Sequence, residues 1–226
     1  GTGKTYLAEA LAEHLAGPDG KTQTIQFHPS YGYEEFIEGI RPELSDTTKA
    51  MEYRVVPGLF RRFCEEARRS PQARFVLVVD EINRGNLPKI FGELLYLLEK
   101  RNQCVRLPYS GEPFSIPENV YLIGTMNSAD HSIALVDMAL RRRFHFKYLD
   151  PRPDILRQWL QQHRPEHVGV ADLLDALNAE LLKEGVEKGL LVGHSHFMSP
   201  KLDEEMVVLI WDHTILPLLE EYFYAR

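Results

Sequence analysis

Residues 1–10 have the sequence GTGKTYLAEA, and the first five decide how the rest of the chain is interpreted. A phosphate-binding loop has the pattern G-x-x-x-x-G-K-[ST], and Gly3, Lys4 and Thr5 match its end. The first glycine of that pattern would lie upstream of Gly1. A partial match of this kind arises by chance in roughly one chain of this length in a hundred, so the loop needs support from the rest of the sequence.

The residues that follow supply part of that support. Gly17 and Pro18 end a segment in which apolar residues recur at helical spacing. These apolar residues are Leu7, Ala8, Leu11, Ala12 and Leu15. GTGKT therefore opens a helix, as a phosphate-binding loop does.

Composition bounds the class of protein. The chain has 226 residues, of which 44% are hydrophobic, enough for one larger domain or for a core with a small appended one. No apolar run of 18 residues and no signal peptide is present, and the first residue is not Met, so we expect a piece of a longer cytoplasmic protein without membrane association. The net charge of −7 argues against a surface that coats nucleic acid. Cys64 and Cys104 lack metal-site spacing, which favours a reducing compartment.

Apolar strands alternate with helices through about residue 149, a pattern that predicts an α/β doubly wound parallel sheet. The predicted strands are 22–28, 74–80, 119–127 and 145–149. The predicted helices are 33–39, 59–69, 87–101 and 132–144, and a hairpin over 105–117 turns at Ser110 and Gly111.

The strand pattern stops at residues 150–153, where the sequence is DPRP. Helices follow, and the longest, 201–223, is expected to be interrupted near Pro217. We therefore expect a nucleotide-binding α/β core over 1–149 and a small helical domain over 150–226. The strand that precedes a phosphate loop is central in such sheets and is missing here, so we expect this piece to fold poorly alone.

The segment 75–86, FVLVVDEINRGN, places Asp80 and Glu81 at the end of a buried strand. Two acids at this position are also typical of a solvated turn or a helix cap. Given the GTGKT loop, we interpret Asp80 as part of a magnesium site and Glu81 as the group that polarises the attacking water. Asn127 follows the next buried strand, so either it caps a turn or its amide lies beside the terminal phosphate. We prefer the second reading because the strand ends converge.

Three consecutive arginines, Arg141, Arg142 and Arg143, end the helix predicted over 132–144. Pairing with the helix dipole accounts for at least one of them. A guanidinium supplied across a subunit boundary stabilises charge in phosphoryl transfer by about 10³ to 10⁵ in rate, and such a role requires an oligomer.

Taken in this order, these elements resemble the AAA+ superfamily of ring-forming nucleotidases, with the helical remainder similar to its lid domain. The segments 27–42, 80–99, 116–132 and 135–146 more narrowly resemble the McrB-type motors of modification-dependent restriction systems. The resemblance implies a GTP-hydrolysing ring, expected to be a hexamer, with a McrC-like nuclease subunit as partner. DNA would be bound through a domain outside this chain.

The resemblance also implies residue roles. Lys4 would bind phosphate, with Gly1, Thr2 and Gly3 as the rest of the nucleotide-binding loop. Thr5 and Asp80 would hold Mg²⁺. Catalysis would rest on Glu81 as base, Asn127 as sensor and Arg143, or else Arg141 or Arg142, as the arginine finger.

Several readings stay open. Asn127 and Asp130 form the pattern N-x-x-D, by which other GTPases recognise guanine. If Asn127 lies beside the terminal phosphate, Asp130, three residues later, is not expected to reach the base. The preference for GTP therefore rests on the resemblance, and ATP remains possible. His194 and Ser195 face nucleotide or a neighbouring subunit or, as we prefer, cap the following helix. The aromatic segment 31–36 is typical of packing under a loop, or else shapes a partner-binding or pore-facing element.

Two alternative functions compete with a restriction motor. One is an AAA+ ATPase of the dynein and MoxR-like group that acts as a remodeller or chaperone. The other is a nucleotide-gated scaffold in which hydrolysis is incidental.

Overall fold

A computed structural model describes residues 1–44, 50–127 and 141–224. The chain divides into two compact units. One is Thr5–Phe146, the α/β unit. The other joins Gly1–Lys4 to Lys147–Arg226, the helical unit. The domain boundary expected at residue 149 stays a prediction.

The α/β unit is built on a parallel sheet of three described strands in the order β1-β4-β7. These strands are β1 (Lys21–Gln26), β4 (Phe75–Asp80) and β7 (Val120–Gly124). The register pairs Lys21 with Phe75 and Phe75 with Val120, so the three strands end at a common edge. Because β4 lies in the middle of the sheet and its two faces are both covered, it is an almost continuous run of buried apolar residues.

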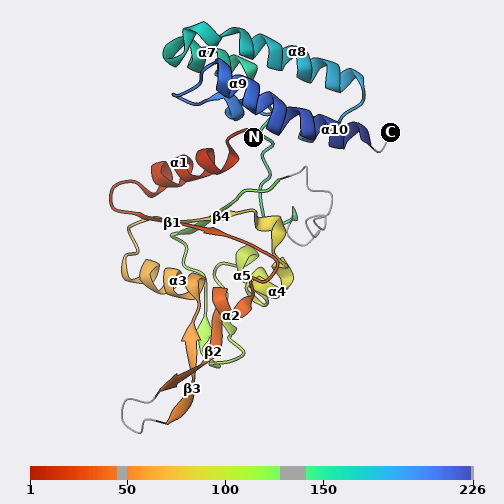
Figure 1. Ribbon diagram of the computed structural model, residues 1–226. Coiled ribbons are helices and arrows are strands. Elements are labelled where there is room, and N and C mark those ends of the chain that lie inside the picture. The colour runs from red at the N-terminus through yellow and green to blue at the C-terminus, as the bar shows by residue number, and fades with distance from the viewer. Residues whose placement is uncertain (45–49, 128–140, 225–226) are drawn as a thin grey trace. The chain divides into compact units, whose positions relative to one another are not determined.

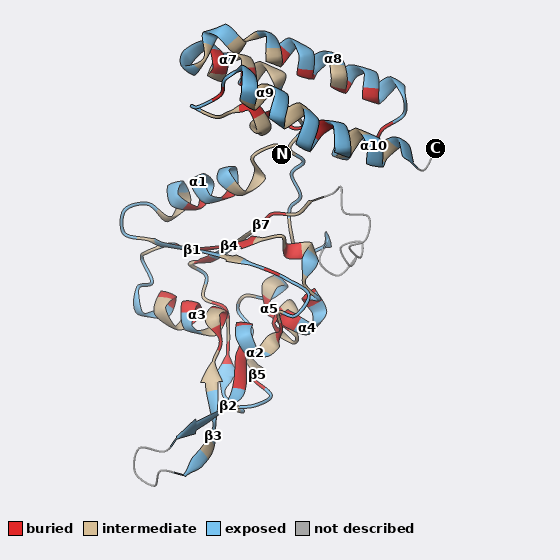
Figure 2. Ribbon diagram, in the orientation of Figure 1, coloured by how far each residue is buried: buried red, intermediate tan, exposed pale blue. Residues whose placement is uncertain are grey.

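Helices cover both faces of this sheet (Figure 1). On one face Val76 and Val78 pack with Ala8 and Ala12 of α1 (Lys4–Ala16). On the other face Phe75, Leu77 and Val79 of β4 join the larger core, which includes residues of α3 (Leu59–Arg69), α4 (Leu87–Phe91) and α5 (Leu94–Glu99). Figure 2 shows the buried residues of α1 and α3 turned toward the sheet. The α/β doubly wound fold class is confirmed.

Two predicted elements differ from the structure. The helix predicted over 87–101 is split into α4 and α5 at Gly92, whose φ of 50° lies in the left-handed region, and the ring of Tyr33 packs at 3.1 Å from the place of a Cβ there. The strand predicted over 145–149 is wrong, since these residues have no regular structure. A strand needs a paired neighbour, and none of the described strands pairs with this segment.

The sequence analysis missed an antiparallel hairpin, β2 (Glu38–Leu44) with β3 (Met51–Pro57). Its base is fixed by Glu38, whose side chain is fully buried. One carboxylate oxygen of Glu38 accepts hydrogen bonds from the backbone nitrogens of Tyr109 and Ser110, both at 3.0 Å. The other oxygen pairs with Arg61 at 2.5 Å. These bonds compensate the burial of the charge and join β2 to α3 and to the second hairpin.

That second hairpin, β5 (Val105–Arg106) with β6 (Pro113–Phe114), is present as predicted, and its turn residue Gly111 has a φ of 68°. The short helix predicted over 33–39 is α2 (Tyr33–Phe36). Phe36 is fully buried and stacks on Phe60 with ring centroids 4.9 Å apart. This geometry supports the packing interpretation of the aromatic segment. The helix predicted over 132–144 lies largely outside the described residues.

The helical unit consists of α7 (Pro153–His163), α8 (Gly169–Lys183), α9 (Glu204–Ile210) and α10 (Leu216–Tyr224) around one apolar core. A π-helical turn, η5 (Trp211–Ile215), joins α9 to α10. Pro217 has no N–H for the bond back to the preceding turn, so the interruption predicted there is confirmed. Short 3₁₀ turns complete the chain: η1 (Ile82–Arg84), η2 (Pro165–His167), η3 (Lys188–Leu190) and η4 (His194–Phe197).

Within the described ranges, none of the helices combines the length and the apolar character that crossing a bilayer requires.

Candidate nucleotide site

Asp80 is the centre of a hydroxyl-carboxylate cluster at the carboxyl ends of β4 and β7. Thr5, the second residue of α1, donates its hydroxyl to Asp80 Oδ1 at 2.8 Å. Thr125, directly after β7, donates its hydroxyl to the same oxygen. Thr125 is buried, and its backbone nitrogen continues the sheet by bonding to Val79 O at 2.9 Å. The Asp80 carboxylate is thus held between a helix start and a neighbouring strand end.

Glu81 leaves the strand in an unusual backbone conformation. Its φ of 51° and ψ of 44° are left-handed, and within the described part of the chain no other residue except glycine has a positive φ. Such a conformation costs about 1 to 3 kcal/mol in a non-glycine residue and persists where surrounding contacts fix it. Here the Glu81 backbone nitrogen donates to Thr125 Oγ1 at 3.3 Å, and its carboxylate pairs with Arg84 Nε at 3.5 Å. At Glu81 the backbone therefore departs from the extended conformation of β4, which ends at Asp80.

Asn83 joins the two strand ends and was missed by the sequence analysis. Its Nδ2 donates to the backbone oxygen of Asn127 at 3.3 Å, and the next residue back, Ile82, donates its backbone nitrogen to Thr125 O at 2.9 Å. Asn83 Oδ1 is buried and accepts no hydrogen bond from the residues that the structure describes. A buried polar atom without a partner is typical of a ligand or water site. In the sequence, the only indication of this role was the largely polar segment 81–86 that follows Asp80.

The first four residues of the predicted phosphate loop, Gly1–Lys4, belong to the helical unit. Gly3 has a φ of 74°, which fits a tight phosphate-binding turn, and Lys4 is the first residue of α1. Thr2 Oγ1 is buried without a described hydrogen-bond partner. The expectation that His194 and Ser195 cap the next helix is wrong. Asp203 caps α9 by accepting a bond from Met206 N at 2.8 Å.

The donor set fits magnesium. Mg²⁺ is usually bound by one or two carboxylates, substrate phosphates and water rather than by a cage of side chains. Thr5 Oγ1 and Asp80 Oδ1, 2.8 Å apart, offer two oxygen atoms of the required kind. No group of three or more His, Cys, Asp or Glu side chains suited to a metal occurs among the described residues, and a nucleotide-dependent site does not need one.

The three arginines differ in exposure. Arg141 and Arg142 are exposed. The Arg143 side chain is 18% exposed, and its guanidinium pairs with Glu99 at the end of α5 at 3.4 Å. Asp130, the residue of the guanine-recognition hypothesis, lies outside the described residues.

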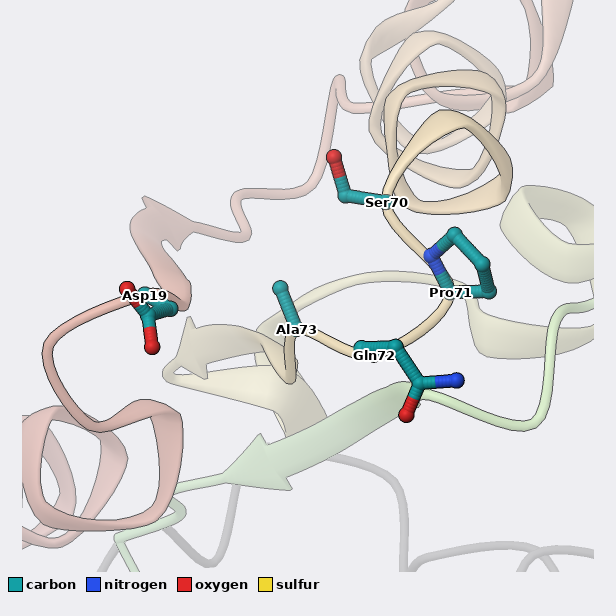
Figure 3. A pocket seen from close by; sticks show the side chains of 5 residues that line it. All are labelled: Asp19, Ser70, Pro71, Gln72 and Ala73. Carbon is teal, nitrogen blue, oxygen red and sulfur yellow. The ribbon is translucent and has the colours of Figure 1, made fainter.

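A surface pocket of about 430 Å³ lies at the opposite end of the strands. In Figure 3 Asp19 lies on one side of it and Ser70–Ala73 on the other, which are the segments before β1 and β4. Ligands of open α/β sheets bind at the carboxyl ends of the strands. This pocket is therefore not part of the candidate site.

The chain matches two known families. Residues 1–144 match the AAA domain (dynein-related subfamily), and residues 169–226 match the McrB alpha-helical lid domain. The chain therefore belongs to the dynein-related subfamily of AAA domains, and its helical unit contains a lid.

Two curated relatives refine this assignment. The chain is 41% identical over 99% of its length to the EcoKMcrB subunit of a type IV methyl-directed restriction enzyme from Escherichia coli, of which it covers 52%. It is 26% identical over 66% of its length to the YdiS component of the type II restriction enzyme BsuMI from Bacillus subtilis, of which it covers 54%. The chain spans about half the length of these relatives. It is an McrB-type AAA+ chain, which confirms the resemblance.

A solved putative ATPase from Cytophaga hutchinsonii is similar over 66% of this chain and 47% of its own, with 15% identity and a TM-score of 0.38. This likeness is too distant to support any argument about function.

Proposed function

We propose that this chain is the nucleoside-triphosphate-hydrolysing motor of a DNA restriction system, with Mg²⁺ as cofactor and GTP preferred over ATP. The hydroxyl-carboxylate cluster of Thr5, Asp80 and Thr125 carries the proposal, because it lies where a helix start and two strand ends meet. The two relatives named as restriction components support the biological role.

In the proposed site Lys4 binds phosphate oxygens, and the backbone of Gly1, Thr2 and Gly3 surrounds them. Thr5 and Asp80 hold the metal, which when bound neutralises charge on the phosphates. The pair of hydroxyl donors keeps the Asp80 carboxylate in one orientation, so the metal-binding oxygen is placed before substrate arrives.

Glu81 is the proposed general base. Its backbone is left-handed, and its carboxylate forms an ion pair with Arg84. The carboxylate accepts a proton from the attacking water, a role that contributes about 10² to 10⁴ in rate. Asn127, linked to this segment through Asn83, orients water and the terminal phosphate with its side-chain amide.

The arginine finger is proposed to act on the site of a neighbouring subunit, which requires a ring, expected to contain six copies. Arg143 stays the first candidate, with Arg141 and Arg142 second. The exposure of Arg141 and Arg142 supports them as groups that reach a neighbour, while Arg143 is partly covered and paired with Glu99. The partners proposed for the ring are a McrC-like nuclease subunit and DNA, bound outside this chain, in the cytoplasm.

Turnover of GTP and of ATP by the full-length protein, with and without the nuclease subunit, tests this function. Glu81→Gln should lower turnover by about 10² to 10⁴ while nucleotide binding is kept. Glu118→Gln is the matched control, because it alters an exposed carboxylate before β7, at the opposite end of the strand from the site. Equal turnover by Glu81→Gln and wild type would remove Glu81 from this role.

Mixed rings test the finger. Each single change to alanine at Arg141, Arg142 or Arg143 is mixed with Glu81→Gln subunits. A finger that acts across the interface gives activity in the mixture that neither variant has alone, because some interfaces combine an intact base with an intact finger. Absence of rescue at every ratio for all three arginines would contradict a finger supplied by a neighbour.

A further inference from the structure

The loop between α8 and α9 contacts Gly1, a residue of the phosphate loop, through two hydrogen bonds. The backbone nitrogen of Ser195 donates to Gly1 O at 3.1 Å. The Gly1 nitrogen lies 2.5 Å from Nε2 of His196. Gly193 permits the approach, because a Cβ at this position would overlap the carbonyl of Gly1. All of these residues belong to the helical unit.

The loop that makes these contacts is itself held in place before Gly193. Asn178 of α8 is buried and brackets Val192 with two hydrogen bonds. Its Nδ2 donates to Val192 O at 2.9 Å, and its Oδ1 accepts from Val192 N at 2.8 Å.

It is also held on the other side. His194 is 8% exposed, and its Nδ1 accepts a hydrogen bond from the backbone nitrogen of Arg152 at 3.1 Å. Phe197 is fully buried in the lid core. The segment 193–196 is thus fixed at both ends and presents Ser195 and His196 to Gly1 from a rigid support.

The chemistry of His196 suits a hydrogen-bond acceptor. Burial lowers the pKa of His196, which favours a neutral ring near pH 7. With Nδ1 carrying the proton, Nε2 accepts a bond from the Gly1 nitrogen. Room beside Gly1 is also limited, since a Cβ on it would lie 2.7 Å from Ser195 Oγ.

We propose that the lid positions the phosphate loop directly, through Gly193, Ser195 and His196 bound to the backbone of Gly1. This inference rests on the proposed function, in which Gly1–Lys4 bind phosphate. Gly1 and Lys4 belong to the same short segment of the helical unit, so contacts that hold Gly1 also limit the conformations of the segment that carries this lysine. Gly193 and His196 are positioning residues for nucleotide affinity, and they do not take part in the chemical step.

Nucleotide binding by variants of the full-length protein tests this proposal, with a fluorescent non-hydrolysable GTP analogue as probe. His196→Ala should weaken binding roughly five- to tenfold, the factor that one hydrogen bond supplies. His196→Gln, whose amide oxygen restores an acceptor, should recover most of it. Gly193→Ala should weaken binding more, because it forces the two segments apart. His213→Ala, an exposed histidine of the same unit, is the matched control.

Steady-state kinetics and thermal unfolding complete the design. The proposal expects KM to rise in His196→Ala and Gly193→Ala while kcat stays within about threefold, with the melting of the lid unchanged in His196→Gln. Unchanged nucleotide affinity in both His196→Ala and Gly193→Ala would overturn it. So would a loss that His196→Gln does not restore, since that result indicates a structural role only.

Lys4→Ala separates this inference from the proposed function. If Lys4→Ala abolishes binding while the His196 and Gly193 variants bind normally, the nucleotide site stands and the lid contact is wrong. If the wild-type protein binds neither GTP nor ATP, the proposed function is wrong, and the inference about the lid is wrong with it.

Discussion

In the α/β unit the polar side chains of the candidate site follow strand ends, whereas in the helical unit they hold a loop. Asp80 ends one buried strand and Asn127 follows another, and the register brings the ends of these strands to one edge. Asn178 and His194 instead reach backbone groups 14 and 42 residues away in sequence. The first arrangement follows from the topology of a parallel sheet, and the second depends on individual hydrogen bonds. The two units should therefore respond differently to core and polar substitutions.

The largest effect is expected from the aromatic core of the α/β unit. Phe91 is fully buried, with its ring centroid 5.0 Å from that of Phe36. Phe91→Ala should lower the free energy of unfolding of this unit by about 3 to 5 kcal/mol, through lost burial and the cavity left behind. In this 226-residue chain the two tryptophans, Trp159 and Trp211, lie in the helical unit, so the fluorescence of this chain reports that unit.

Urea unfolding followed by far-ultraviolet circular dichroism and by tryptophan fluorescence measures the two responses. Phe91→Ala should shift the circular dichroism transition and leave the fluorescence transition in place. Tyr96→Ala in α5 is the control, because its side chain is 48% exposed. Equal shifts in both signals would show that the units unfold together.

A polar substitution should give the next largest effect, in the other unit. Asn178→Ala leaves the backbone N–H and C=O of Val192 buried without partners, which costs about 1 to 3 kcal/mol for each group. The fluorescence transition should move to lower urea and the amide of Val192 should exchange faster. An unchanged exchange rate would mean that water replaces both bonds.

Acid should also act on the helical unit. Burial lowers the pKa values of His194 and His196 below the value of about 6.5 in the unfolded chain. The unfolded state therefore binds more protons just below about pH 6.5, so the stability of this unit should rise with pH up to about pH 6.5 and level off above it. Each histidine contributes at most about 1.4 kcal/mol per pH unit. Fluorescence-detected melts from pH 4.5 to 7.5 measure the slope, and a flat profile would contradict it.

The smallest effect is expected at the surface. Lys21 of β1 pairs with Glu66 of α3 at 2.6 Å, and both side chains are more than 40% exposed. Lys21→Met should change the free energy of unfolding by less than about 1 kcal/mol, because water and salt screen the pair. The circular dichroism transition at 0.05 and 0.5 M NaCl measures this change, and a shift as large as that of Phe91→Ala would be inconsistent with a screened pair.

The sequence predicted much of the α/β unit because its strands and helices have strong periodic patterns. Asp80 and Asn127 were found from their places after buried strands. Thr125 and Asn83 were not, since a threonine or asparagine in a loop carries no pattern of its own. The break at Gly92 was missed because it depends on packing against Tyr33, a residue distant in sequence. The hairpin β2–β3 was missed because it depends on the ion pair between Glu38 of β2 and Arg61 of α3.

By itself the sequence determined the class of this protein: buried strands alternate with helices, and polar residues occur where those strands end. Hydrophobic periodicity and loop composition are local properties, so they can be recognised in the amino-acid sequence. Only the tertiary structure decided that Thr125 binds Asp80, that Glu81 leaves its strand with a left-handed backbone, and that Gly193 and His196 meet Gly1. These contacts join residues far apart in the chain or depend on single backbone angles, and no spacing in the sequence encodes them.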